Sequence, residues 1–149
     1  MADYPIQNFH FQVDWGGTRI GFESVENLEV QSTYIEYREG SSKEYGTMKL
    51  PGRPIYGNIV LKRGVFPKDT EFFKWWRDTY FFMERGQPGS LYRRTVTIQV
   101  LDEEHKPILT WQLHNAFPVR FAVSDLHAQG NEVLIETLEL TYEGLNLEA

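Results

Sequence analysis

Four histidines are the first residues in this chain that could do chemistry, because imidazole binds metals and transfers protons. They are His10, His105, His114 and His127. No two of them have the His-x-His or His-x-x-x-His spacing, whereas a metal site needs three or four convergent donors. We interpret them as solvated side chains and expect no metal site.

No local motif predicts a nucleophile or a phosphate site. The chain has no cysteine, so thiolate chemistry and disulfides are absent, and no serine lies in a Gly-x-Ser-x-Gly elbow. A Ser-His-Asp triad is defined by geometry, which the sequence alone does not exclude. The Gly-Gln-Pro-Gly run at 86–89 follows a predicted helix instead of preceding one. It therefore lacks the N–H groups of a helix N-terminus, which would hold a phosphate. We expect no catalytic residue, no cofactor and no enzyme activity.

Clustered acidic residues could serve as acid–base pairs, but their spacing favours solvated surfaces. Residues 102–104 are acidic and fall in a predicted turn. In the last predicted strand, Glu136 lies across the pleat from Glu139 and Glu143, because side chains alternate with a period of two.

Two basic pairs, Lys62-Arg63 and Arg93-Arg94, stand near the ends of predicted strands. One interpretation is ordinary charge at a strand end. The other is salt bridging to an acidic face of a partner subunit, for which the glutamate-rich final strand is suited.

Four tryptophans offer the best alternative function, a platform on which a sugar stacks. Trp15 and Trp111 share strand registers with Phe and Leu, and Trp76 falls on the apolar side of a predicted helix, which favours core packing. Trp75 points away from Trp76 and is expected to cover a neighbouring surface. A carbohydrate- or small-ligand-binding β-sandwich therefore remains the alternative.

Composition indicates one globular domain spanning residues 1–149. Hydrophobic residues make up 41% and aromatic residues 15% of the chain, which excludes intrinsic disorder. A net charge of −6 argues against affinity for nucleic acid. We see no secretory signal and no apolar run long enough to span a membrane, and we expect assembly in the cytoplasm.

Hydrophobic periodicity predicts a mainly β chain. Gly16-Gly17 is expected to turn a first strand back onto a second one that contains Ile20 and Phe22. A helix is predicted at 69–83, with Phe72, Trp76, Thr79, Tyr80 and Met83 near one face. Further strands are predicted at 9–15, 28–38, 59–62, 95–101, 108–114, 117–123 and 132–142. This pattern predicts an antiparallel β-sandwich or barrel with one packed helix and a long protruding loop.

The protruding loop is the segment between Tyr37 and Gly64. It begins and ends as strand, but about twenty residues between show no clean period, and loops beyond about 12–15 residues are uncommon in compact domains. The segment also contains prolines, glycines and apolar residues, so we expect an arm that orders against another molecule. The last predicted strand, at 132–142, lacks Pro and Gly and is either central or paired by a neighbour. A head-to-tail interface would build a ring or a filament.

Several short motifs, in order and spacing, carry a family resemblance. They are Tyr37-Arg38-Glu39-Gly40, Leu50-Pro51-Gly52-Arg53, Leu61-Lys62-Arg63-Gly64, the run 115–119 after Trp111, and the run 131–145. With them the chain resembles the tail-tube proteins of contractile phages and the inner-tube proteins of contractile injection systems, from Tyr4 to Leu145.

The resemblance implies a structural subunit that forms hexameric rings, each closing an inner β-barrel around a lumen. Stacked rings form a rigid tube that a contractile sheath drives through a target envelope. The implied partners are sheath, baseplate and tube-terminator proteins, with DNA or protein cargo passing through the lumen without specific binding. The particle would be a virion or an extracellular or membrane-attached machine, and its acidic subunits would give a negative or neutral bore.

The resemblance also assigns contacts between rings or subunits to the arm and to one basic pair. The residues implied are Tyr37, Arg38, Glu39, Gly40, Ser41, Ser42, Lys43, Glu44, Tyr45, Leu50, Pro51, Gly52, Arg53, Lys62 and Arg63.

Overall fold

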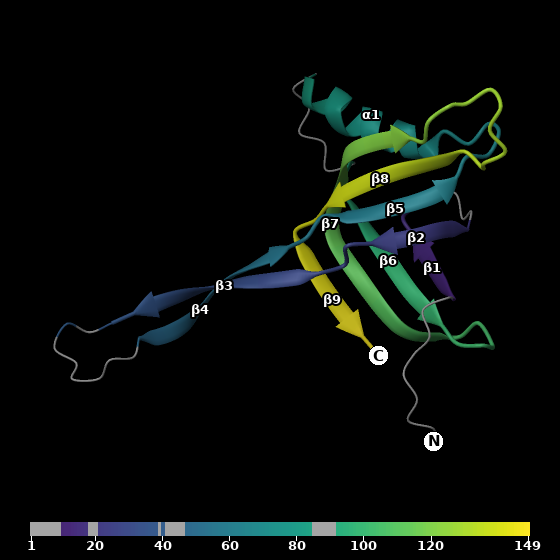
Figure 1. Ribbon diagram of the computed structural model, residues 1–149. Helices are drawn as coiled ribbons and strands as arrows, with labels where there is room; N and C mark the ends of the chain where they lie inside the picture. Colours follow the sequence, from purple (N-terminus) through teal and green to yellow (C-terminus); the bar gives the residue numbers. More distant parts are fainter. Residues whose placement is uncertain (1–9, 18–20, 39, 41–46, 85–91) are drawn as a thin grey trace.

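A β-rich body with one projecting two-stranded arm makes up the described part of the chain (Figure 1). The computed structural model describes residues 10–17, 21–38, 40, 47–84 and 92–149. The predicted fold class, mainly β and antiparallel with one helix, is confirmed.

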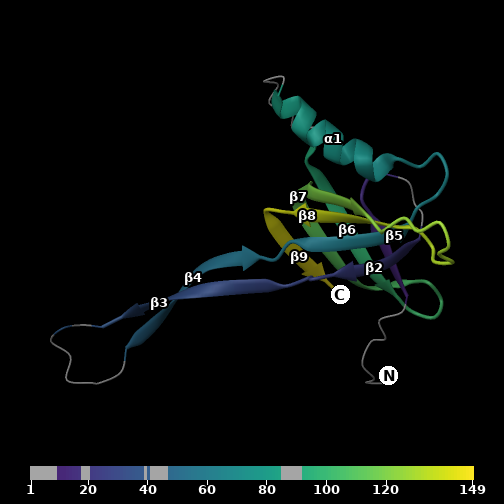
Figure 2. The same cartoon turned by 45° about the horizontal axis from the view of Figure 1, so that its top comes forward.

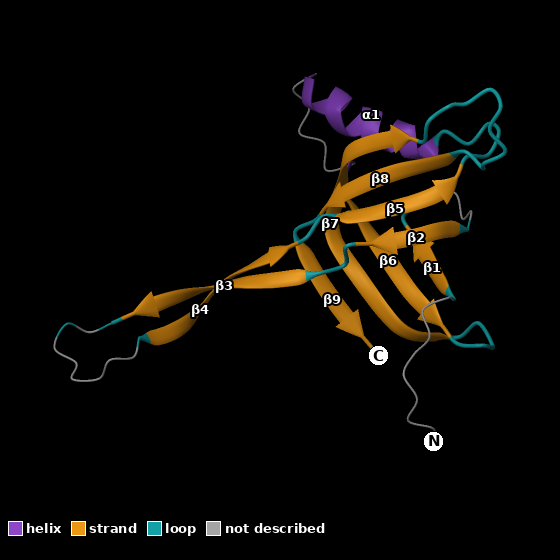
Figure 3. Cartoon of the chain, in the orientation of Figure 1, coloured by secondary structure: helices purple, strands orange, loops and turns teal. Residues whose placement is uncertain are grey.

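The body is a seven-stranded antiparallel sheet that folds over on itself. Its strand order is β1-β6-β7-β8-β5-β2, and β9 also pairs with β7. Figure 3 shows β8, β5 and β2 in front of β6, β7 and β1. The strands are β1 (Phe11–Asp14), β2 (Phe22–Glu26), β5 (Ile59–Gly64), β6 (Arg94–Leu101), β7 (Pro107–Val123), β8 (Ile135–Thr141) and β9 (Gly144–Glu148).

The predicted hairpin at Gly16-Gly17 is wrong. Strand β1 pairs with β6 and β2 pairs with β5, so the two strands lie at opposite ends of the strand order. Gly16 has a φ of +80°, and a Cβ on Gly17 would collide with the Trp15 ring. The chain therefore does turn here, but it turns around the buried Trp15 side chain and away from β1. No pairing joins β1 to β2 in the described residues, so the barrel stays open.

Strand β7 is the fold line of the sheet, and it replaces two strands predicted at 108–114 and 117–123. Its first part pairs with β6 and β9, and its second part pairs with β8. The two parts meet near Asn115, whose φ of 55° is one that asparagine tolerates better than most residues. The last predicted strand is central, because β8 lies between β5 and β7. The further strand β9 was not predicted.

Alternating apolar residues from both halves of the sheet form the core. They include Val13, Ile59, Leu61, Val96, Ile98, Leu113, Leu138 and Leu140, each no more than 4% exposed. Burying one such side chain contributes about 1.5–3 kcal/mol, so this row stabilises the body and fixes the register of its strands.

Helix α1 (Glu71–Glu84) covers one side of the body (Figure 2). The Asp69 carboxylate accepts a hydrogen bond from the Glu71 N–H at 3.2 Å and so caps the helix. The predicted buried face is wrong in one respect: Trp75 is buried, and its indole N–H donates to the Tyr92 carbonyl at 2.6 Å. Trp76 is only half-buried. Because aromatic residues occupy several faces of this helix, periodicity alone did not identify the buried one.

The arm consists of β3 (Val30–Tyr37) and β4 (Met48–Tyr56), which pair only with each other. Part of the expected structureless loop is thus a strand. In Figures 1 and 2 the arm points away from the rest of the molecule.

Candidate assembly interface

The arm exposes apolar side chains that no described residue elsewhere in its chain covers. All eight residues of β3 are exposed. Its large apolar side chains are 45–62% exposed: Val30, Tyr34, Ile35, Tyr37, Met48, Leu50 and Ile55. Large exposed apolar side chains that gather on one small element mark interaction sites. The arm is therefore the candidate interface.

Proline and glycine residues do not prevent β4 from forming, because a bulge accommodates them. Gly52 and Arg53 together lie opposite Thr33, where the register shifts. The Arg53 N–H donates to the Thr33 hydroxyl at 2.9 Å, and a Cβ on Gly52 would collide with the Thr33 backbone. A two-stranded ribbon has two free edges, where a proline's missing N–H is tolerated. This is why a strand forms where the sequence pattern indicated a loop.

The outer half of the arm has one apolar and one mixed face. Cross-strand partners share a face, and Ile35 pairs with Leu50 as Tyr37 pairs with Met48. We call these four residues the apolar face.

The opposite, mixed face pairs Tyr34 with Pro51 and Glu36 with Lys49. The Lys49 ammonium lies 5.2 Å from the centre of the Tyr34 ring. An interface built by the outer arm would therefore use the apolar face and leave the mixed face to water.

The base of the arm is fixed to the body. The Gly57 N–H donates to the Glu29 carbonyl at 3.1 Å, and the Asn27 side chain donates to the Asn58 carbonyl at 2.7 Å. Tyr56 also packs against Tyr142, with ring centres 5.5 Å apart. The body therefore sets the direction in which the arm projects.

Charge separates the arm from the body. Residues 30–56 contain four basic and three acidic residues and so carry a net charge of +1. Because the whole chain carries −6, the rest of the chain carries −7. A weakly basic arm on an acidic body favours contact between the arm of one copy and the body of another.

Arg63 does not reach a partner subunit, contrary to the expectation from sequence. It is fully buried, donates to Glu136 at 2.6 Å and to Asp69 at 3.2 Å, and lies 4.0 Å above the Phe72 ring. Burial raises the pKa of Glu136, and the hydrogen bond from Arg63 opposes that rise. The expected acidic partner is thus in the same chain, and we remove Arg63 from the set of contact residues. Lys62, on the other face of β5, lies 3.3 Å from Glu26.

The second basic pair also finds its partners within the chain. Arg93 forms an ion pair with Glu143, which also accepts a hydrogen bond from Asn115 at 3.0 Å. The hydrogen bond from Arg93, more than the one from Asn115, lowers the pKa of Glu143. Arg94 lies 4.7 Å above the Trp75 ring, and burial lowers its pKa. The glutamates of the C-terminal strands therefore serve the fold of their own chain.

The remaining expected contact residues fall into three groups. The first group lies on the arm or at its outer end: Tyr37, Arg38, Gly40, Leu50, Pro51, Gly52 and Arg53. Lys62 lies on the body. The third group falls outside the described residues: Glu39, Ser41, Ser42, Lys43, Glu44 and Tyr45. Sequence reasoning missed Ile35 and Met48 on the apolar face. Pairing the strand at 28–38 with the residues after the turn would have found them.

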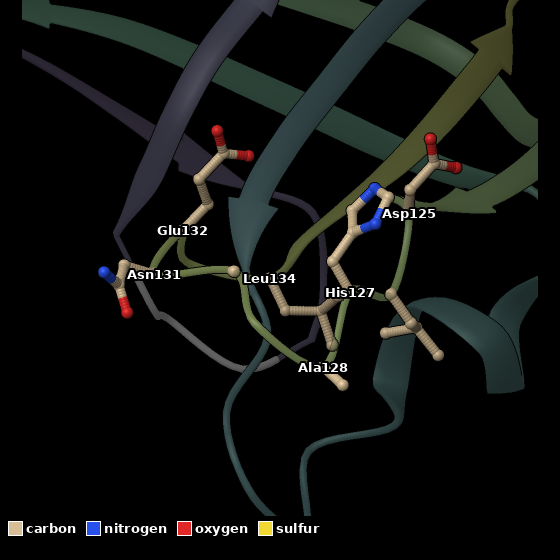
Figure 4. Close-up of a pocket in the computed structure, with 8 residues that line it drawn as sticks. Asp125, His127, Ala128, Asn131, Glu132 and Leu134 are labelled. Atoms are coloured by element: carbon tan, nitrogen blue, oxygen red, sulfur yellow. The ribbon is translucent and has the colours of Figure 1, made fainter.

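Two hollows in the body lack the convergent polar groups of a reactive site. The larger, about 730 Å³, lies in the loop between β7 and β8 (Figure 4), where the Asp125 and Glu132 carboxylates do not converge. The smaller, about 390 Å³, lies between β2 and the half of the sheet formed by β1, β6 and β7, and its lining is mostly apolar. The described residues contain no group of three potential metal ligands. No described helix is long and apolar enough to cross a membrane.

A family model described as "T4-like virus tail tube protein gp19" matches residues 7–146. Among solved structures, the chain is similar to a chain of the PVC sheath–tube complex of an extracellular contractile injection system in the extended state. The TM-score is 0.81 at 29% identity, covering 99% of this chain and 93% of that one. A chain of the cap that terminates the anti-feeding prophage tube has a TM-score of 0.81 at 25% identity, covering 99% of this chain and 93% of that one. A chain of the six-fold symmetrised baseplate of the same particle has a TM-score of 0.80 at 27% identity, covering 99% of this chain and 97% of that one.

More distant comparisons add only the fold. Hcp1 from Flavobacterium johnsoniae has a TM-score of 0.54 at 15% identity, covering 93% of this chain and 94% of that one. Human extended synaptotagmin-2 is 26% identical over 105 residues, which is 70% of this chain but 10% of that protein. The chain thus spans about a tenth of the length of that curated relative, and no activity follows from the match. None of these findings supports the sugar-binding alternative.

Proposed function

Because the chain belongs to the T4-like virus tail tube protein family, we propose that its copies form hexameric rings that stack into the rigid inner tube of a contractile tail or injection particle. The observation that carries this proposal is the arm, whose apolar face is exposed in a single chain and needs another copy to cover it. Solved structures of a sheath–tube complex and of a six-fold symmetrised baseplate contain similar chains, which supports both the tube and the hexamer.

The proposed partners follow from the same structures. A contractile sheath would surround the tube, a terminator would close one end and a baseplate would hold the other, since similar chains occur in such assemblies. The chain would assemble in the cytoplasm and then act as part of a virion or an extracellular particle. Its role is structural rather than catalytic: DNA or protein cargo would pass through the lumen without specific binding.

Electron microscopy tests the proposal. Purified protein, alone or with its baseplate, should form rings or tubes in negative stain, and averaged end views should show six-fold symmetry. Leu50→Ala on the apolar face of the arm should weaken tube formation. Its matched control is Lys49→Ala on the mixed face, which should still assemble. A wild-type protein that stays monomeric at all concentrations, with or without the baseplate, would contradict the proposal.

A further inference from the structure

The apolar core continues onto a strip of sheet that the body leaves uncovered. Phe11, Val100 and Trp111 lie on the same side of β1, β6 and β7 as the core residues, and all three are half-buried. Leu147 of β9, the partner of Trp111, is 54% exposed. Figure 1 shows β6, β7 and β9 extending past the level of β2. Sheet strands with an open apolar face need a covering layer.

Phe11, Val100 and Trp111 of this strip also line the smaller hollow. We call this hollow the seam groove because it lies where β1 and β2 fail to pair. Val25 and Leu28 form one side of the groove, and Glu23 adds a carboxylate at its rim. Its lining is otherwise mostly apolar. The groove is therefore an opening into the core rather than a polar binding pocket.

We propose that the seam groove of one copy receives the apolar face of the arm of a second copy. This inference rests on the proposed function and specifies which surface the arm contacts. Both surfaces are apolar, and each is left uncovered in the single chain. Together they form a head-to-tail contact that can repeat from copy to copy.

The arm cannot fill the groove of its own chain. With nine residues in β4 and about 3.3 Å per residue, the arm is about 30 Å long, and both views show it directed away from the body. The packing of Tyr56 against Tyr142 of the body holds its base in that direction. The occupant must therefore come from another copy.

Charge supports this pairing. The turn between β6 and β7, at the lower end of the uncovered strip, contains Asp102, Glu103 and Glu104, with Lys106 paired to Glu104 at 3.4 Å. The arm carries Arg38 and Arg53, both exposed. Opposite charges around an apolar contact fix its register and speed association.

The competing surface is the loop between β7 and β8. Leu126 and Val133 are 80% and 71% exposed there, but Leu126 stands between Asp125 and His127 in the chain, and Val133 follows Asn131 and Glu132. That loop presents isolated apolar residues among polar ones, whereas the seam groove is continuous with the core. We therefore assign the arm to the groove.

Cross-linking between introduced cysteines tests the assignment. Because the chain has no cysteine of its own, only the introduced cysteines react with the cross-linker. Leu50→Cys protein is mixed with Val100→Cys protein, or with protein carrying Glu23→Cys, an exposed residue that lines the groove, should Val100→Cys fail to fold. The mixture is assembled into tubes and treated with a short bis-maleimide, which avoids the strict distances of a disulfide. The control replaces Leu50→Cys with Lys49→Cys, one residue away on the mixed face.

A linked dimer several-fold stronger with Leu50→Cys than with Lys49→Cys is the expected result. Equal or absent linking in tubes that form normally would overturn this inference and leave the proposed function standing. Preferential linking of Leu50→Cys to Leu126→Cys or Val133→Cys would also overturn it, in favour of the loop. Failure of the wild-type protein to form tubes would instead overturn the proposed function, and this inference with it.

Discussion

The arm and the body contain the same kinds of residue, yet the body buries its apolar side chains and the arm exposes them. Leu138 in β8 is fully buried, whereas Leu50 in β4 is 45% exposed. The difference is the number of layers: the body folds one sheet over on itself, and the arm is a separate pair of strands with no described helix or strand on either face. An isolated two-stranded ribbon is marginally stable in water. The arm thus has the composition of a core and gains its packing only through assembly.

The largest effect on the stability of the body is expected from Arg63→Ala. The variant leaves the buried Glu136 and the Asp69 carboxylates without their cation, and breaking a buried ion pair costs about 3–5 kcal/mol. Denaturant unfolding measures the loss. Lys62→Ala, which removes a solvent-exposed pair with Glu26, is the control and should cost about 1 kcal/mol or less. Equal effects of the two variants would show that Arg63 is not structural.

A matched pair of leucine truncations compares the two regions directly. Leu138→Ala should reduce the free energy of unfolding by about 2–5 kcal/mol, because it leaves a cavity in the core. Leu50→Ala should change it by no more than about 0.5 kcal/mol, as for most surface substitutions, yet weaken tube formation. Unfolding of the monomers and microscopy of the assemblies provide the two readouts. A large loss of monomer stability in Leu50→Ala would mean that the arm packs on its own body.

Glu136 and Glu143 should make the free energy of unfolding depend on pH in opposite directions. Both effects should be smaller than those of Arg63→Ala and Leu138→Ala. Burial raises the pKa of Glu136, so its contribution to stability is full below its unfolded pKa of about 4.3 and is lost as the pH rises through the folded pKa. The pKa of Glu143 is lowered by Arg93, so its contribution is present above about 4.3 and is lost as the pH falls through the folded pKa.

Unfolding of the wild type, Glu136→Gln and Glu143→Gln across pH 3–8 measures these dependences. The advantage of the wild type over Glu136→Gln should shrink as the pH rises, and its advantage over Glu143→Gln should shrink as the pH falls. Slopes of the same sign for both variants would contradict the assignment of one buried and one surface ion pair.

Deleting residues 41–49 should have the smallest effect on the folded monomer and abolish stacking of rings. The deletion removes the start of β4, including Met48 of the apolar face, but no residue of the core. Circular dichroism and thermal unfolding of the monomer should stay close to those of the wild type, while tubes should be absent in negative stain. A deleted chain that no longer folds would place the arm within the folding unit and remove the contrast with the body.

The sequence by itself determined the class of the protein. Alternation in 95–101 and 108–114, the helix after Asp69 and the absence of cysteine predicted a non-covalent, mainly β structure, and the motifs around Tyr37, Leu50 and Leu61 predicted the family. These features are local: a period of two or of 3.6 residues, a cap or a short motif is read from neighbours in the chain.

Only the tertiary structure decided which residues meet. It paired β1 with β6 instead of β2, buried Trp75 instead of Trp76, and gave Arg63 its partners Glu136 and Asp69. It also turned part of the expected loop into β4, because a bulge opposite Thr33 accommodates Gly52 and the neighbouring prolines. Strand pairing and burial depend on contacts between residues far apart in the chain, and periodicity carries no information about those partners. The apolar face of the arm exists only once β3 and β4 are in register.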